Sequence, residues 1–245
     1  MKGDARPLTP ASGPLSASKG LLGAWQCHNR GMLELGVKIV IAYLVGALIG
    51  SLILGRLRGV DIRSMGSGNA GATNALRTQG KVFGLLVLAF DIGKGVFVVW
   101  WLPTAVLPVV GIDPDLPRAW LTVACGFAVI VGHVYPVWFN FRGGKGVATV
   151  VGVIAAIDPR LLAPLLVSWL IVLVLSGYVG LASMLSGVVL VAAVYVREPN
   201  NVPLLSFCAA VTAFVIYTHR GNIARMRAGR ESRVRRLWLF RSRAA

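Results

Sequence analysis

Residues 82–102 read VFGLLVLAFDIGKGVFVVWWL, a run in which Asp91 and Lys94 are the only charged side chains. A helix needs about 20 mostly apolar residues to cross the roughly 30 Å hydrocarbon core of a bilayer. This run has that length and that composition, so it predicts a transmembrane helix. Further apolar runs precede and follow it, and together they decide the class of fold.

The composition of the whole chain supports the same interpretation. Of its 245 residues, 56% are hydrophobic and 14% are charged, and the mean hydropathy is +0.73. Soluble domains carry about 25% charged residues because their surfaces face water, and disordered chains are poor in apolar residues. The composition excludes both classes and predicts an all-α, polytopic integral membrane protein.

We expect about seven transmembrane helices in the chain. They are predicted at residues 35–55, 82–102, 118–138, 146–157, 161–176, 180–196 and 202–218. The fourth is short, since at about 1.5 Å per residue it reaches only about 18 Å. It either begins earlier, at Gly143-Gly144, or is a re-entrant half helix. Because a single helix through Pro159 would be far too long, the fourth and fifth segments are expected to form a hairpin.

The basic residues predict the orientation in the membrane. The chain holds 25 Lys+Arg against 9 Asp+Glu, a net charge of +16. With seven spans, most of the basic residues fall on one side, in loop 56–81, in the loop with Arg142 and Lys145, and in the tail from residue 219. Such loops face the cytoplasm, so we predict an outer N-terminus and a cytoplasmic C-terminus. A nucleic-acid partner would need a soluble basic face; the lipid bilayer is the better partner.

The chain is expected to have three parts. Residues 1–31 are polar and aperiodic, so they predict a disordered extension, and Met32 is a second candidate for the natural start. Residues 32–219 form the transmembrane domain. Residues 220–245 form a basic cytoplasmic tail, whose last arginines are typical of a segment that binds anionic lipid.

The loop after the first span is rich in small residues. Residues 64–77 read SMGSGNAGATNALR. Small residues let successive backbone N–H groups surround a phosphate, Ser67 adds a hydroxyl, and Arg77 adds a bidentate cation. A flexible linker is the alternative. The candidate phosphate-binding residues are Gly66, Gly68, Asn69, Gly71, Thr73, Asn74 and Arg77.

A second loop on the same side has a similar character. Residues 132–149 read GHVYPVWFNFRGGKGVAT. The candidate phosphate-binding residues here are Gly143, Gly144, Lys145 and Gly146, although the spacing is not that of a P-loop. For the aromatic residues Tyr135, Trp138, Phe139 and Phe141 we favour an interfacial belt. His133, near a span end, is interpreted as a packing or interfacial histidine.

A third polar segment follows the last span and reads HRGNIARMRAGRE, residues 219–231. If the helix continues, His219 and Asn222 are three residues apart and share a face. An imidazole and an amide placed there could hold and deprotonate a hydroxyl. A juxtamembrane segment that binds anionic lipid is the alternative.

The runs GSGNAGATN, GHVYPVWFNFRGGKGVAT and HRGNIARMRAGRE resemble the three signature segments of the bacterial acyl-phosphate:glycerol-3-phosphate acyltransferase family. They occur in that family's order, and the resemblance covers about Leu35 to Glu231. The chain departs from the family pattern at Ala70, where proline is commoner, at Tyr135, where phenylalanine is commoner, and at Thr218, where a basic residue is common. These departures affect loop shape more than polar groups.

The resemblance implies a seven-helix enzyme of the bacterial cytoplasmic membrane with its active site on the cytoplasmic face. It would transfer a fatty acyl group from acyl phosphate to the 1-hydroxyl of glycerol 3-phosphate, giving lysophosphatidic acid and phosphate, the first step of phospholipid synthesis. Acyl phosphate is already activated, so the reaction demands positioning and charge stabilisation rather than a metal, a cofactor or a covalent nucleophile.

Roles for individual residues follow from that chemistry. Ser67 and Asn222 are candidate donors to the oxyanion, and His219 is the candidate base, although the leaving phosphate could itself take the proton. Arg77 and Lys145 would hold phosphates.

Two questions remain open from the sequence. Asp91 and Lys94 stand three residues apart inside a span, which indicates either a functional pair or mutual neutralisation. The alternative function is a membrane transporter of an organophosphate or another anion, since phosphate-binding loops and broken helices occur there too. Against it, the sequence has no convincing internal repeat, and its polar motifs gather at one face.

Overall fold

The computed structural model describes residues 14–108, 110–234 and 238–239, with side chains from residue 30 onward. Within these residues every regular element is helical. The α-helices are α1 (Pro14–Gly46), α2 (Gly50–Leu57), α3 (Ala72–Gln79), α4 (Lys81–Trp101), α5 (Arg118–Val134), α6 (Val147–Ile157), α7 (Leu162–Ser176), α8 (Val179–Arg197), α9 (Val202–Thr218) and α10 (Arg220–Arg227). Short 3-10 turns occur at Ile62–Ser64, Val137–Phe139 and Pro159–Leu161. The all-α prediction is confirmed.

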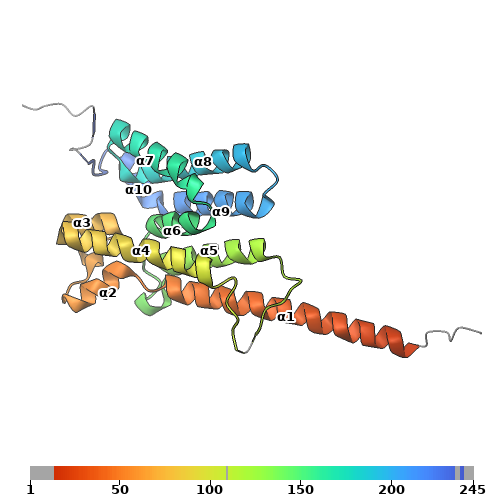
Figure 1. Cartoon of the computed structure of the whole chain (residues 1–245). Helices are drawn as coiled ribbons and strands as arrows, with labels where there is room; N and C mark the ends of the chain where they lie inside the picture. The colour runs from red at the N-terminus through yellow and green to blue at the C-terminus, as the bar shows by residue number, and fades with distance from the viewer. Residues whose placement is uncertain (1–13, 109, 235–237, 240–245) are drawn as a thin grey trace, which may run out of the picture.

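The helices pack in two groups with α6 between them (Figure 1). Helix α1 packs along α5 and α4 packs on α6, while α7, α8 and α9 form the other group. The short helices α2, α3 and α10 all lie at one end of the molecule, and the start of α1 projects beyond the opposite end. One end of the bundle therefore collects the segments that carry the sequence motifs.

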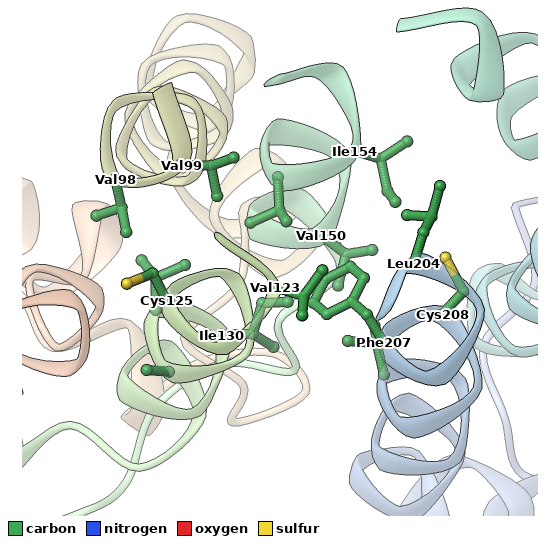
Figure 2. Packing of buried hydrophobic residues seen from close by; sticks show 14 of the residues in the cluster. Val98, Val99, Val123, Cys125, Ile130, Val150, Ile154, Leu204, Phe207 and Cys208 are labelled. Carbon is green, nitrogen blue, oxygen red and sulfur yellow. The ribbon is translucent and has the colours of Figure 1, made fainter. Parts of the chain in front are cut away.

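The main hydrophobic core joins α4, α5, α6 and α9. Figure 2 shows Val98 and Val99 of α4 facing side chains of α5 and α6, with Phe207 of α9 beside Val123 and Val150. In water, burying a large apolar side chain stabilises a fold by about 1.5–3 kcal/mol. Between helices in a bilayer, van der Waals packing contributes more to stability than the hydrophobic effect does. This core therefore depends on how closely the helices approach.

Glycines allow that close approach. A side chain at Gly152 of α6 would overlap the carbonyl oxygen of Ile92 in α4, and one at Gly132 of α5 would overlap the carbonyl of Tyr43 in α1. Small residues at such contacts let helix backbones meet in a membrane, where van der Waals packing drives association.

The predicted spans are reproduced in part. Helices α4 and α8 are long and apolar enough to cross a membrane, as are Pro159–Ser176, which contains α7, and Arg118–Phe139, which contains α5. Two bent pairs could add a span each: Arg30–Gly46 with α2, bent by 45°, and α9 with α10, bent by 51°. Helix α6 has 11 residues, or about 16 Å. Four to six candidate spans are thus established, and the count of seven stays a prediction.

The described part of the N-terminal segment is helical, and the disorder predicted for residues 1–31 stays a prediction. Residues 14–31 belong to α1, which begins at Pro14 and runs without interruption into the apolar stretch. Proline suits the first position of a helix, and the alanines and leucines that follow have high helix propensity. The remainder of the predicted extension, residues 1–13, lies outside the described residues.

A buried polar cluster lies toward the opposite end of the bundle from α2 and α3. Glu34 and Lys38 of α1 are both 0% exposed and form an ion pair of 2.8 Å. Arg118, at the start of α5, also pairs with Glu34, and Lys38 donates a hydrogen bond to the carbonyl of Pro103 (3.0 Å). The cluster fastens the connection between α4 and α5 to α1.

Candidate active site

A cavity of about 480 Å³ brings the three polar segments of the sequence together. Ser67 and Arg77 reach it from the first segment, Lys145 from the second, and His219 and Asn222 from the third. These residues are separated by up to 155 positions in the chain, yet they line one space at the end of the bundle where α2, α3 and α10 lie. The polar motifs therefore form one site.

The first loop is shaped by the side chain of Asn74. This side chain is 2% exposed, and its Oδ1 accepts a hydrogen bond from the N–H of Ser67 (3.0 Å). Its Nδ2 donates to the carbonyls of Ile62 (3.1 Å) and Met65 (2.9 Å). Three backbone groups of the loop thus depend on one amide, so Asn74 acts on the ligand site by forming the loop.

Two further contacts hold this loop in place. Ser51 of α2 donates to the carbonyl of Ala70 (2.7 Å). Arg63, which also pairs with Asp61 (2.8 Å), donates to the carbonyls of Phe139 (3.0 Å) and Arg142 (3.3 Å) in the second loop. The two loops predicted to bind phosphate are therefore joined directly.

Two helix N-termini face the cavity. Helix α3 begins after Gly71 and α6 begins after Gly146, and neither has a side-chain hydrogen bond at its N-cap. The first residues of both helices, Ala72 and Val147, line the cavity. Uncapped N–H groups and the positive end of the helix dipole bind anions. With Arg77 and Lys145 beside them, they make this part of the cavity suited to phosphate groups.

The cation of the second loop is tied to the third segment. The ammonium of Lys145 donates to Oδ1 of Asn222. The Nδ2 of Asn222 donates to Glu231 (2.6 Å), which also pairs with Arg225 (2.6 Å). Burial lowers the pKa of Lys145 to about 8, and the nearby Arg225 adds to this while Glu231 opposes it. Lys145 is therefore still mostly cationic at neutral pH, but it loses its proton at a lower pH than an ordinary lysine.

His219 lies at the bend between α9 and α10 and is 3% exposed. Its Nδ1 lies 2.8 Å from the carbonyl oxygen of Val215, one turn earlier in α9. Because a carbonyl only accepts, Nδ1 carries the proton, and in the neutral ring Nε2 keeps the lone pair. That tautomer is able to accept a proton from a substrate hydroxyl.

The deeper part of the cavity is apolar. Leu165 and Trp169 of α7, Leu190 of α8 and Val211 of α9 line it, and the Trp169 indole donates to Ser183 (3.2 Å). Apolar side chains on the outer surface of α4 and α7 also border the cavity.

The predicted site residues fall into two groups. Those that line the cavity are Ser67, Asn69, Gly71, Thr73, Asn74, Arg77, Lys145, His219 and Asn222. The other five are glycines that do not line the cavity, and they contribute through the backbone conformation of the loops: Gly66, Gly68, Gly143, Gly144 and Gly146. Gly66, Gly68 and Gly146 have φ of 57°, 72° and 84°, a region that favours glycine.

The aromatic residues of the second loop do not form one belt. Phe139 is 6% exposed and packs with Ile49 and Leu52 of the α1–α2 region and with Ala70 of the first loop. For Phe139 the belt interpretation is therefore wrong, because its side chain is buried against the first loop and the α1–α2 region instead of facing the membrane interface. Trp138 and Phe141 are more than half exposed, and their place in a belt stays a prediction.

Sequence reasoning missed Glu231 as a functional residue. It lines the cavity and accepts hydrogen bonds from both Asn222 and Arg225. The available signal was that Glu231 is the only acidic residue of the segment 219–245. Within the described residues, no group of three or more His, Cys, Asp or Glu side chains could hold a metal ion.

Comparison with known proteins agrees with this architecture. The family model described as "Glycerol-3-phosphate acyltransferase" matches residues 37–229. A glycerol-3-phosphate acyltransferase of Aquifex aeolicus (strain VF5) is 38% identical over 197 residues, which cover 80% of this chain and 96% of that protein. One of Bacillus velezensis is 40% identical over 190 residues, covering 77% and 91%.

Two solved structures of an acyltransferase are also similar to this chain. The crystal structure of PlsY (YgiH), an integral membrane glycerol 3-phosphate acyltransferase, in its glycerol 3-phosphate form superposes with a TM-score of 0.71 at 36% identity, covering 81% of this chain and 94% of that one. Its lysophosphatidic acid form gives 0.70 at 34% identity. The resemblance seen in the three motifs is confirmed: the chain belongs to the glycerol-3-phosphate acyltransferase family of integral membrane proteins.

Proposed function

We propose that this chain uses an acyl phosphate as donor when it acylates the 1-hydroxyl of glycerol 3-phosphate, and that it does so at the cytoplasmic face of a bacterial inner membrane. One observation carries the proposal: the cavity combines two uncapped helix N-termini, Arg77 and Lys145 at its polar end with an apolar interior. Both substrates carry phosphate, and one also carries an acyl chain. The cavity offers matching surfaces for all three groups.

The chemistry needs few groups beyond these. The 1-hydroxyl oxygen of glycerol 3-phosphate attacks the acyl carbon, a new ester C–O bond forms, and the bond from that carbon to the phosphate oxygen breaks. Nε2 of His219 would take the hydroxyl proton. Ser67 and the remaining N–H of Asn222 would donate to the oxyanion that develops on the acyl oxygen.

Arg77 and Lys145 would hold the two phosphates while this happens. A guanidinium can contact a phosphate through two parallel N–H groups, whereas an ammonium acts as a point charge. Asn69, Thr73 and the N–H groups of α3 and α6 complete the phosphate contacts. Holding both substrates in one geometry contributes to the rate without any covalent intermediate on the enzyme.

For the topology we propose seven crossings, with α6 as the fourth, an outer N-terminus and a cytoplasmic C-terminus. The clustering of basic residues at the end with α2, α3 and α10 supports this orientation. Single cysteines at Thr78, Asn140 and Ser232 should be shielded from an impermeant thiol reagent in intact cells. Labelling of all three from outside would show that the topology is reversed. Labelling of Ser232→Cys alone would show that the chain crosses the membrane one time fewer between Asn140 and the tail.

Phosphate release tests the donor and separates this function from transport. Purified protein given acyl phosphate should release inorganic phosphate only when glycerol 3-phosphate is added, in equal amount to the lysophosphatidic acid formed. Acyl-CoA in place of acyl phosphate should give no product. Acylation from acyl-CoA would refute the donor assignment. Uptake of glycerol 3-phosphate into proteoliposomes without any acylation would favour the transporter alternative.

A further inference from the structure

Three buried polar side chains lie directly behind the second loop. Asp91 and Lys94 of α4 and His133 of α5 are 0%, 6% and 2% exposed. The Nζ of Lys94 lies 3.0 Å from Oδ1 of Asp91 and 2.9 Å from Nδ1 of His133. We refer to Asp91, Lys94 and His133 as the buried triad.

Lys94 joins the buried triad to the break between α1 and α2. Its ammonium also donates to the carbonyls of Gly46 (2.9 Å) and Leu48 (2.8 Å), which α1 leaves unpaired where it ends. With Asp91 and His133 as well, four polar atoms lie within 3.0 Å of an ammonium that has three N–H donors, so Lys94 ties the break between α1 and α2 to the buried triad.

His133 in turn contacts the loop that carries Lys145. The N–H of Gly144 donates to the carbonyl of His133 (3.1 Å), and the N–H of Gly143 donates to the carbonyl of Val134 (3.1 Å). The imidazole lies so close that any side chain at Gly144 would overlap its Nε2. The position of the imidazole therefore fixes the backbone one residue before Lys145.

Asp91 extends the same unit toward the first loop. Its Oδ1 is 3.4 Å from the N–H of Gly50, the first residue of α2, and the next residue, Ser51, holds Ala70 of the first loop. Asp91 also lines the cavity, and within the described residues its Oδ2 has no hydrogen-bond partner. Replacing a buried ion pair by apolar residues is often neutral or stabilising. A contribution to stability is therefore a weak explanation for the Asp91–Lys94 pair.

We propose that the buried triad is a positioning device for Lys145, in which Lys94 sets the orientation of His133 and His133 sets the loop Gly143–Lys145. The proposal rests on the role assigned above to Lys145 as a phosphate-binding cation. Lys94 and His133 act only through Lys145 and touch no substrate. Loss of the triad should therefore impair the same step that loss of Lys145 impairs.

A double-mutant cycle in the full-length protein, reconstituted in lipid, tests this. The triad change is Asp91→Asn with Lys94→Met, which removes both charges together, and the partner change is Lys145→Ala. We expect the triad change to lower kcat/KM for glycerol 3-phosphate by roughly 10–100-fold, as for a small misplacement of a binding group. In the Lys145→Ala background the same change should cost less than about threefold, since coupled residues are not additive.

Gly144→Ala provides a second route if the charge-free variant does not fold. It leaves the triad intact but displaces the loop from His133, and its loss should likewise disappear in the Lys145→Ala background. Lys38→Met is the matched control, because Lys38 is also a buried lysine paired with an acid on its own helix, at the other end of the bundle. Its effect, whatever its size, should be the same with and without Lys145.

The outcomes separate the two levels of the proposal. Full additivity of the triad change with a defective Lys145→Ala variant would overturn the positioning role while leaving the phosphate role intact. A Lys145→Ala variant with wild-type kcat/KM would refute the phosphate role and the positioning proposal with it. Thermal unfolding of each variant, measured alongside, identifies losses that come from stability.

Discussion

Replacing Asn74 by alanine should disable the first loop without removing any group that touches a charged substrate atom. The variant loses the hydrogen bonds to the N–H of Ser67 and to the carbonyls of Ile62 and Met65. At about 1 kcal/mol each, these sum to about 3 kcal/mol of loop stabilisation. If that free energy is needed to order the loop around a phosphate, kcat/KM should fall by about two orders of magnitude.

Steady-state kinetics with acyl phosphate and glycerol 3-phosphate would measure this, with Thr78→Val as the control. Thr78 lies one turn along α3 and donates a hydrogen bond to the carbonyl of Asn74 (2.9 Å), so its loss removes one bond from the helix but none from the loop. We expect Thr78→Val to stay within about fivefold of wild type. An Asn74→Ala variant that stays within the same range would show that the amide does not order the loop.

Other predictions follow from the cavity. Arg77→Lys keeps the charge but loses the bidentate contact, so it should raise KM for a phosphate substrate more than it lowers kcat; equal KM with lower kcat would contradict a binding role. His219→Ala should instead lower turnover at saturating substrate, by about 10²–10⁴-fold for a lost general base, and wild-type turnover in a folded variant would show that His219 is not the base. Because the pKa of Lys145 is lowered to about 8, its cation is present below that pH and lost above it. The profile of kcat/KM, which reports the free enzyme, should fall between about pH 7 and 9.5 and flatten over that range in Lys145→Arg. Finally, a chain that begins at Met32 should insert and remain active, because it retains the Glu34–Lys38–Arg118 cluster; loss of activity in inserted protein would give residues 1–31 a working role.

The sequence predicted the class of fold and the convergence of the motifs for clear physical reasons. Long apolar runs have few alternatives to membrane helices, and loops on one side of a bundle are close by necessity. Ser67, Lys145 and His219 were therefore predicted to share a site from their types and from the parity of the spans, and all three line one cavity.

Other features depend on contacts that no local pattern encodes. The break at Gly46–Gly50 was absorbed into one predicted span, because the carbonyls freed there are satisfied by Lys94, 46 or more positions away. Phe139 resembled an interfacial aromatic residue, but it is buried because Arg63 draws the two loops together. Asn74 looked like a ligand-binding amide, although its side chain is occupied by its own loop.

The exposed leucines of α4 and α7 that line the cavity have a consequence for how the enzyme meets its substrates. Leu85 and Leu166 both line the cavity and are 60% and 46% exposed, so a long-chain donor would enter sideways from the leaflet while glycerol 3-phosphate arrives from water. The rate would then follow the mole fraction of donor in the bilayer and not its bulk concentration. Adding inert lipid at constant total donor would then slow the reaction by surface dilution.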